Sequence, residues 1–314
     1  MDGELPRGES RTADLGGPVH WVDYGGRQRG DRPTMVLVHG LGGSHLNWDL
    51  LAPRLTPHAR VVALDLPGFG RSEPGDRRAT VHANVDVLDR FLADVVRGPV
   101  VLVGNSMGGM ISILAAGRAR DRVQGIVLLD PAVPGPRRQL DPMVAAVFAA
   151  YAVPGVGERF MWLRRNRQTP LARALSLLRL CGVDPDALPP EVIDRSVEMI
   201  EQREDVDGMD RSFLSAARSL LLVLADPRRY RRAMADLRPP VLFLHGERDR
   251  LIPVIAARDV ARRHPTWRYV ELPGVGHVPQ LQVPDRVAAE ILRWLPTTQS
   301  TRGRKVSRSA SSPV

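Results

Sequence analysis

The segment Gly104–Gly109, Gly-Asn-Ser-Met-Gly-Gly, places one serine between glycines directly after an apolar run of strand length, Val100–Val103. A strand followed by Gly-x-Ser-x-Gly and then by a helix-forming segment predicts a sharp turn that presents the serine at the edge of a sheet. Glycines suit such a turn because flanking side chains would collide with the neighbouring strand and helix. The pattern therefore predicts that Ser106 is the nucleophile of a covalent reaction.

A serine hydroxyl is a weak nucleophile near neutral pH, so this chemistry needs a base close to the serine. The chain has eight histidines, and only His277 lies in a late loop of small residues, Gly274–Pro279, before a helix-forming segment. The glycines of that loop leave the ring free to reach a distant residue. The loop predicts His277 as the general base, with a solvated loop histidine as the alternative.

A third side chain must hold the base in the correct tautomer. Where the motifs follow the chain order serine, acid, histidine, this side chain is an Asp or Glu that follows a strand before the histidine loop. The strand-like segment 240–245 leads into a glycine-containing turn that displays Asp249. Glu247 lies in the same turn but closer to the strand end, and Asp130 ends another strand-like segment. Asp249 is the expected acid, and Asp130 is the second candidate.

A glycine-rich loop, His39–Gly43, follows the strand-like segment Met35–Val38. Backbone N–H groups in such a loop can point at the negative charge that develops during acyl transfer. The expected donors are the N–H groups of Leu41 and Met107, the second at a helix start where the helix dipole also favours an anion. His39 is expected to brace the loop by hydrogen bonding rather than to react.

Together these segments resemble the α/β-hydrolase family, in its serine esterase, lipase and C–C hydrolase branch. The resemblance covers residues 18–296 apart from an insertion, and its motifs, in family order, are His39–Gly43, Asp65–Ser72, Gly104–Gly109, His245–Pro253 and Gly274–Pro279. It implies that Ser106, Asp249 and His277 form a catalytic triad and that the N–H groups of Leu41 and Met107 form the oxyanion hole.

The resemblance also bears on one further acid and on the type of nucleophile. It implies a structural role for Asp65, whose carboxylate is expected to cap backbone donors of the turn Asp65–Ser72. Relatives that act on halides or epoxides carry aspartate at the nucleophile position, so Ser106 argues against both activities.

Strand-like and helical segments alternate along the chain, which predicts a mostly parallel sheet with helices on both faces. The resemblance implies that this is the α/β-hydrolase fold. The apolar runs of buried-strand type are Val19–Tyr24, Thr34–Val38, Val61–Leu64, Val100–Val103, Val123–Leu129, Val241–Leu244 and Trp267–Leu272. All three expected catalytic positions follow such runs, at the sheet edge where open α/β folds carry their sites.

The alternation breaks over residues 131–237, which predicts a helical cap inserted into a core formed by residues 16–130 and 238–296. Residues 1–15 are expected to be a flexible N-terminus. Residues 297–314, with four basic residues and no acid, are expected to be a disordered basic tail. The cap helices are expected at Asp141–Val153, Glu158–Leu180, Pro190–Gln202 and Arg211–Ala225.

Charge divides the predicted cap into two halves. Residues 137–179 carry eight arginines against two acids, whereas residues 184–210 carry ten acids against two arginines. The two halves are expected to attract each other as solvated helix faces, and the alternative is that the arginine half meets an anionic lipid surface or an acidic substrate. Apolar residues of the first half either pack the cap on the core or line the substrate pocket, and the pocket candidates are Phe148, Tyr151, Met161 and Trp162.

Composition agrees with a protein that buries a full core, since 43% of its 314 residues are hydrophobic and 25% are charged. The N-terminal residues are polar and the apolar runs are short, so neither a secretory leader peptide nor a membrane-spanning helix is expected. A cytoplasmic location is expected. Cys181 is the only cysteine, and it is expected to be an inert core residue remote from the motifs. The net charge of +9 accompanies no nucleic-acid motif, and no cluster has metal-ligand spacing, so no nucleic acid, metal or cofactor is expected.

These observations predict a serine hydrolase of carboxylic esters that acts on a small-molecule or lipid ester, with weak membrane-surface association as a further expectation. One alternative is a C–C bond hydrolase of meta-cleavage-type diketones, although Val278 follows His277 where many members of that branch carry tryptophan. The other alternative is a ligand-binding protein that keeps the scaffold without catalysis, against which the full set of three catalytic residues argues. The sequence indicates neither the acyl chain or ring type nor the oligomeric state.

Overall fold

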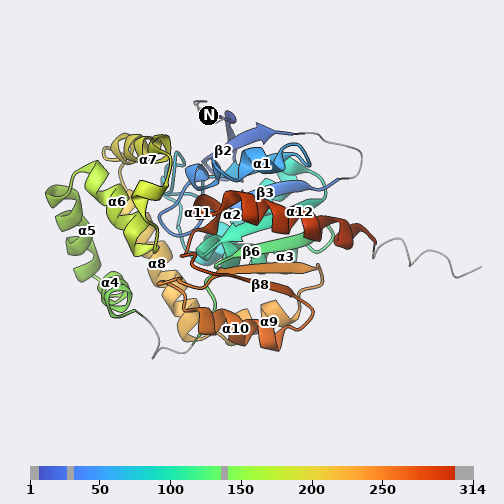
Figure 1. The fold of residues 1–314 in the computed structure, drawn as a ribbon. Helices are drawn as coiled ribbons and strands as arrows, with labels where there is room; N and C mark the ends of the chain where they lie inside the picture. Colours follow the sequence, from blue (N-terminus) through green and yellow to red (C-terminus); the bar gives the residue numbers. More distant parts are fainter. Residues whose placement is uncertain (1–6, 27–31, 136–140, 301–314) are drawn as a thin grey trace, which may run out of the picture.

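The computed structural model describes residues 7–26, 32–135 and 141–300, the last five of them by their backbone alone. Its centre is an eight-stranded sheet with the order β1-β2-β4-β3-β5-β6-β7-β8 (Figure 1). Antiparallel pairing joins β1 to β2 and β2 to β4, and all other pairs are parallel, which confirms the mostly parallel sheet. The strands are β1 (Glu9–Asp14), β2 (Pro18–Gly25), β3 (Thr34–Val38), β4 (Val61–Leu64), β5 (Val100–Asn105), β6 (Val123–Leu129), β7 (Val241–Gly246) and β8 (Arg268–Leu272).

The two faces of the sheet bury alternate side chains of the same strands. Leu102 of β5 shares a cluster with Ile111 of α3, whereas its neighbour Val103 shares a cluster with Ile291 of α12 on the opposite face. Because both faces are buried, these strands are continuous apolar runs in the sequence. Helices α2 (Val81–Arg90), α3 (Met107–Arg118) and α10 (Val254–Arg263) contribute to the first cluster, and α1 (Ala52–Leu55) and α12 (Pro284–Ser300) to the second.

Five helices between β6 and β7 form a layer at one side of the sheet, which we call the α4–α8 layer (Figure 1). The expected single helix Glu158–Leu180 is wrong, because α5 ends at Arg167 and α6 begins at Pro170. The Thr169 hydroxyl accepts the Ala172 N–H at 3.2 Å, so a capping residue followed by proline starts a new helix. The helices are α4 (Pro142–Ala152), α5 (Val156–Arg167), α6 (Pro170–Leu180), α7 (Pro190–Gln202) and α8 (Met209–Ala225).

Helix α9 (Arg228–Ala235) follows the layer and packs on the core. Tyr230 and Met234 are buried in the same cluster as α3, and the Tyr230 hydroxyl donates to the Ala132 carbonyl at 3.0 Å. No helix was expected at this position from the sequence. Helix α8 of the layer shares this cluster through Ala216 and Leu220.

The N-terminal segment also departs from the expectation of a flexible residue 1–15 stretch. Residues 9–14 form β1, which pairs with β2 from Glu9 opposite Asp23 to Asp14 opposite Pro18. The strand is polar and mostly exposed, so its backbone hydrogen bonds carry no apolar signature in the sequence. At the other end, α12 continues to Ser300, and the remainder of the expected basic tail, residues 301–314, lies outside the described residues.

Within the described ranges, no helix taken singly is long and apolar enough to cross a membrane. Helices α4 and α5 meet the length and composition criteria only as a pair, and the pair is bent by 113°.

Candidate active site

Ser106 occupies the sharp turn between β5 and α3 that the sequence predicts. Its backbone has φ 53° and ψ −119°, a conformation that costs a side-chain-bearing residue roughly 1–3 kcal/mol and persists only where the surrounding structure imposes it. A Cβ on Gly108 would overlap the Val38 carbonyl, and one on Gly104 would lie 2.5 Å from the Gly108 carbonyl oxygen. Both glycines are therefore required by close backbone packing, and the turn holds Ser106 at the carboxyl end of β5.

Asp249 and His277 are joined by a hydrogen bond. His277 Nδ1 donates to Asp249 Oδ2 at 2.7 Å, and Asp249 Oδ1 accepts the N–H groups of Leu251 and Ile252 at 2.8 and 3.0 Å. Burial opposes ionisation, but the charge and hydrogen bond of His277 outweigh it and lower the pKa of the Asp249 carboxyl. The bond fixes the tautomer of His277, which leaves Nε2 as its second ring nitrogen for proton transfer.

Asp130, the second candidate acid, is held differently. Its Oδ1 accepts the Gly246 N–H at 2.8 Å, and its Oδ2 is buried without a partner in the described part of the chain. Burial and the nearby Asp249 carboxylate raise the pKa of Asp130 well above its usual value. Glu247 accepts the Gly274 N–H at 2.9 Å and supports the loop that carries His277. Of the three acids considered, the structure joins Asp249 to His277.

The two expected oxyanion donors lie on the predicted loops. Leu41 follows β3 and lines the same cavity as Ser106, and Met107 is the first residue of α3. Throughout the described ranges, neither N–H has an acceptor within the protein. Gly40 packs closely against the Ser106 side chain, since an added Cβ there would lie 3.0 Å from the Ser106 Cβ. Both N–H groups thus remain available to a bound oxyanion near Ser106.

His39 and Asp65 brace these loops, as expected. His39 Nδ1 donates to the Gly40 carbonyl at 2.8 Å and its Nε2 accepts the Leu66 N–H at 3.0 Å, which links the two loops. Burial lowers the pKa of His39 to about 4, so the ring is neutral at physiological pH. Asp65 Oδ2 accepts from the Nδ1 atoms of His20 and His45 at 2.8 and 2.9 Å and from the Arg71 N–H at 2.9 Å.

Among the described residues, two sets of three side chains are close enough to share a metal ion. The first is His20, His45 and Asp65, and the hydrogen bonds just described already occupy its ring nitrogens and carboxylate. The second, Asp130, His245 and Asp249, surrounds the catalytic turn. His245 Nε2 donates to the Ile252 carbonyl at 2.9 Å, and Asp249 is committed to His277. The first set is thus an internal hydrogen-bond network, whereas in the second Asp130 Oδ2 and His245 Nδ1 have no hydrogen-bond partner among the described residues.

Asn105 and Cys181 contribute to the site although the sequence analysis missed both roles. The Asn105 side chain donates to the carbonyls of His277 and Leu129 at 3.0 Å each, which fastens the His277 loop to β5 and β6. The Cys181 carbonyl accepts the His277 N–H at 2.8 Å, and Cys181 lines the cavity, so its expected remoteness from the motifs is wrong. Burial raises the pKa of its thiol to about 12. A polar residue between Gly104 and Ser106 was the one signal available for Asn105.

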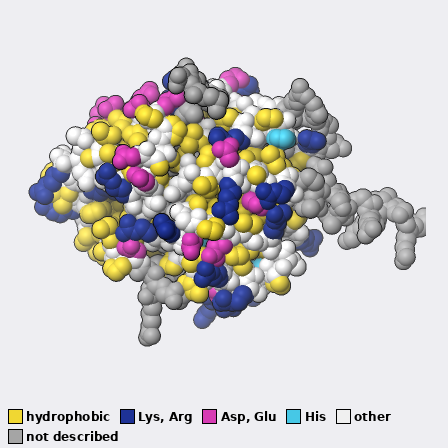
Figure 2. Space-filling view, in the orientation of Figure 1, with side chains coloured by type: hydrophobic (Ala, Val, Ile, Leu, Met, Phe, Trp, Pro, Cys, Tyr) yellow, Lys and Arg dark blue, Asp and Glu magenta, His cyan; other side chains and the backbone are white. Residues whose placement is uncertain are grey.

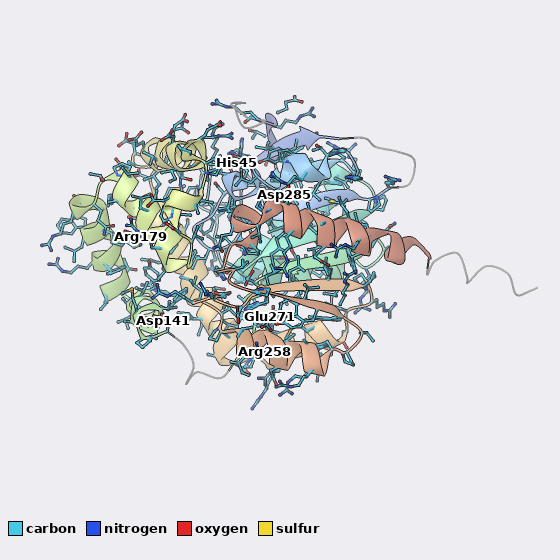
Figure 3. The ribbon with its side chains drawn as sticks, viewed as in Figure 1. His45, Asp141, Arg179, Arg258, Glu271 and Asp285 are labelled. Atoms are coloured by element: carbon cyan, nitrogen blue, oxygen red, sulfur yellow. The ribbon has the colours of Figure 1, made fainter. Side chains whose placement is uncertain are left out.

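Arg250, next to Asp249 in the chain, ties the α4–α8 layer to the catalytic turn. Its Nε and Nη2 donate to Asp141 Oδ2 at 3.0 and 2.9 Å, and its Nη1 donates to the Arg179 carbonyl at 3.5 Å. Asp141 caps the N-terminus of α4, and Arg179 lies near the C-terminus of α6 (Figure 3). One guanidinium group therefore connects two helices of the layer to the turn that carries the acid.

A cavity of about 770 Å³ lies between the catalytic loops and the α4–α8 layer. Ser106 and His277 line it, and so do the pocket candidates Phe148, Tyr151 and Met161. The fourth candidate, Trp162, is outside the wall: it is 50% exposed, with the Arg159 guanidinium 5.9 Å from its ring. Adjacent positions on a helix point about 100° apart, so a helix that turns Met161 inward turns Trp162 outward.

Comparison with known proteins gives matches over most of the chain. A family model described as "Alpha/beta hydrolase family" matches residues 35–290. The pimeloyl-[acyl-carrier protein] methyl ester esterase of Aromatoleum aromaticum is 30% identical over 264 residues, which cover 83% of this chain and 97% of that relative. The dihydrolipoyllysine-residue acetyltransferase component of the acetoin cleaving system of Pseudomonas putida is 29% identical over 288 residues, or 91% of this chain and 69% of the relative.

Solved structures give the same picture. A thermophilic esterase from Thermogutta terrifontis matches with a TM-score of 0.65 and 26% identity, covering 92% of this chain and 99% of the other. A loop variant of the haloalkane dehalogenase DbeA from Bradyrhizobium elkanii matches with a TM-score of 0.77 and 20% identity, covering 95% and 100%. The second likeness, at that identity, concerns the fold alone.

Proposed function

The chain belongs to the α/β hydrolase family and has the α/β-hydrolase fold, and within that family we propose that it is a serine hydrolase of carboxylic esters. The observation that carries the proposal is the His277–Asp249 hydrogen bond in the wall of the cavity onto which Ser106 also opens. The name of the Aromatoleum aromaticum relative, a methyl ester esterase, supports ester cleavage as the reaction type.

In the proposed reaction the Ser106 hydroxyl attacks the ester carbonyl, and His277 Nε2 takes its proton. Asp249 holds His277 in the required tautomer and stabilises the imidazolium that forms. The N–H groups of Leu41 and Met107 bind the oxyanion of the tetrahedral intermediate. His277 then protonates the departing alcohol, and a water activated by the same ring cleaves the acyl-enzyme.

The residues around His277 favour ester cleavage over carbon–carbon cleavage. A ring-fission diketone must gain a proton on carbon, so its charged dienolate needs polar groups near the base. Val275 and Val278 flank His277 and are buried and apolar, and Gln280 is fully buried and outside the cavity wall. An unpaired charge in such surroundings is costly. An ester expels an alkoxide instead, which His277 can protonate directly.

The α4–α8 layer is proposed to act as the cap of this site. It supplies the apolar wall opposite the catalytic loops, with Phe148 and Met161 among its members. Its tie to the Asp249 turn through Arg250 and Asp141 aligns that wall with the acid. A cap of this kind would exclude bulk water from the acyl-enzyme and select the substrate.

A fluorophosphonate probe tests whether the serine is active. We expect labelling of the wild-type protein at Ser106 and none in Ser106→Ala. Equal labelling of both proteins would contradict the assignment, and no labelling of a folded wild type would favour a ligand-binding protein without catalysis.

A panel of acyl esters and ring-fission diketones then decides the reaction class. A specificity constant for a diketone about ten times that of the best ester would overturn ester hydrolysis.

A further inference from the structure

The cavity has a second, charged region that the α4–α8 layer builds. Four guanidinium groups and two carboxylates line this region, so the described part of its wall carries a surplus of two positive charges. They come from α5, α6, the end of α7 and α8. The arginines are Arg164, Arg165, Arg173 and Arg203, and the acids are Glu204 and Asp210.

Two of the arginines are matched by the acids. Arg173 forms an ion pair with Glu204, and Arg165 Nη1 lies 3.4 Å from Asp210 Oδ2. The basic and acidic halves of the layer meet here, so the attraction expected between them is present. Figure 2 shows acidic side chains over α7 and basic ones over α5 on the outside of the same layer. These pairs use both carboxylates of the cavity wall.

The other two arginines have only neutral partners in the described ranges. Arg164 Nη1 donates to the Tyr151 hydroxyl at 3.3 Å, and Arg203 Nη2 donates to the Gly68 carbonyl at 3.1 Å. The Nε–H groups of Arg203 and Arg173 are buried without an acceptor. Burial lowers the pKa of both side chains, yet a guanidinium stays charged at neutral pH. Asp65 and Asp210 act on Arg203 through their charge, but its hydrogen bond goes to a neutral carbonyl. A buried guanidinium that no carboxylate contacts is costly, and an anion in the same cavity would offset that cost.

The charged region adjoins the catalytic loops. Arg203 is bonded to Gly68, in the turn Asp65–Ser72 that His39 links to the glycine-rich loop His39–Gly43. In the His39–Gly43 loop, a Cβ on Gly42 would lie 3.2 Å from the ring of Phe213 in α8. Apolar side chains make up most of the remaining wall. The cavity therefore joins a reactive serine to an anion-attracting region through an apolar interior.

We propose that the substrate of this site is an ester whose far end carries an anionic group, a carboxylate or a phosphate, bound by Arg164 and Arg203. The inference rests on the proposed ester hydrolysis and names its substrate class. The ester lies at Ser106, and an apolar chain occupies the space between the two ends. Arginine suits both anions because its planar fork donates two parallel hydrogen bonds to their oxygens.

The test uses 4-nitrophenyl octanoates that differ only at the far carbon, which ends in a carboxylate, a phosphate or a neutral carboxamide. We expect kcat/KM for at least one anionic ester to exceed that for the carboxamide by about 10- to 100-fold, the range of a hydrogen bond to a charged group. The carboxylate and phosphate arms distinguish the two anions. Arg164→Gln should reduce this preference about 10-fold, and Arg203→Gln serves as an independent variant.

Arg167→Gln is the matched control, because Arg167 is exposed on the same helix and does not line the cavity. It removes the same charge, so the preference should stay unchanged. Equal turnover of the anionic and neutral esters would contradict the inference while leaving ester hydrolysis intact. A preference that fell equally in Arg164→Gln and Arg167→Gln would also contradict it, since the charges would then act at long range.

A binding measurement keeps the two proposals separable if no ester is cleaved. That outcome would contradict the proposed function, and the charged region would then be tested alone. Calorimetry on Ser106→Ala compares octanedioic acid monoamide with the diamide. Binding of the acid at least about 10-fold more tightly supports an anion site, and equal binding refutes it.

Discussion

The catalytic turns and the α4–α8 layer position their side chains by different means. In the turns, the backbone conformation sets the positions of the side chains. Ser106 lies at φ 53° between glycines where no side chain would fit, and both carboxylate oxygens of Asp249 accept hydrogen bonds. In the layer, ion pairs such as Arg218–Glu158 hold the helices, and large apolar residues such as Leu222, 72% exposed, face outward. Under the proposed function, the chemistry would depend on a few residues held by the backbone, and substrate choice would depend on many side chains of the layer.

Removal of the nucleophile or the base should separate the two regions most strongly. Ser106→Ala and His277→Ala should each lower ester turnover by about 10⁴-fold or more, because the catalytic residues act as one unit. No single substitution in the layer should approach that loss. Steady-state kinetics on purified, folded variants provide the measurement, and most of the activity surviving in either variant would refute the assignment.

The two acids near His277, Asp249 and Asp130, are expected to contribute unequally to turnover. Asp249→Asn should lower kcat about 10³- to 10⁴-fold, since the amide would stabilise the wrong tautomer of His277. Asp130→Asn should change kcat by less than about 10-fold, because Asp130 is bonded to the Gly246 N–H rather than to His277 and asparagine keeps an acceptor oxygen of similar shape there. If the two variants exchanged these outcomes, Asp130 would be the acid.

The turns that carry Ser106 and His277 could be predicted from the sequence because the shape of each depends on local requirements. Backbone packing requires glycine near Ser106 and in the loop that carries His277. This requirement produces a fixed spacing of glycines in the sequence. The hydrogen bonds that support these turns were harder to predict from the sequence. Asn105 reaches His277, 172 positions away, through one amide, and nothing in the sequence announces so distant a pairing.

The layer was harder to predict because its signals are spread out. Helical composition was visible, but the break at Pro170 was missed inside a long helix-forming run. Which of Met161 and Trp162 faces the cavity depends on the rotation of α5, which tertiary packing sets. Strand β1 was missed for a related reason, since an exposed polar edge strand has no apolar alternation to read.

Stability against pH should also differ between the two regions. The pKa of His39 is lowered from 6.5 to about 4 in the folded protein, so its contribution is complete above pH 6.5 and is lost as the pH falls towards 4. The loss is on the order of 3 kcal/mol. In the layer, the Arg218 hydrogen bond lowers the pKa of Glu158 from 4.5 to about 2, so its contribution, weakened by solvent, is lost only below pH 4.5.

Urea unfolding from pH 7.5 to 3 measures both contributions. His39→Gln should flatten the fall in unfolding free energy between pH 6.5 and 4.5, whereas Glu158→Gln should leave that interval unchanged. An unchanged slope in His39→Gln would mean that its ring is not held neutral in the folded protein.

The smallest expected effect lies within the layer itself. Phe148→Ala should lower kcat/KM for a medium-chain ester about 10-fold through a higher KM, because Phe148 lines the cavity. Trp162→Ala should change it less than about 2-fold, since that ring is outside the wall. Equal losses in the two variants would show that α5 presents a different face to the substrate.

The central claim is that Ser106 carries the acyl group during turnover. Rapid acid quench during hydrolysis of a 4-nitrophenyl ester, followed by mass spectrometry of the intact protein and of its peptides, observes that intermediate directly. We predict that the protein gains the mass of one acyl group, that this group is on the peptide containing Ser106, and that Ser106→Ala gains none. An acyl group on another residue, or turnover in which the protein never gains the acyl mass, would contradict it.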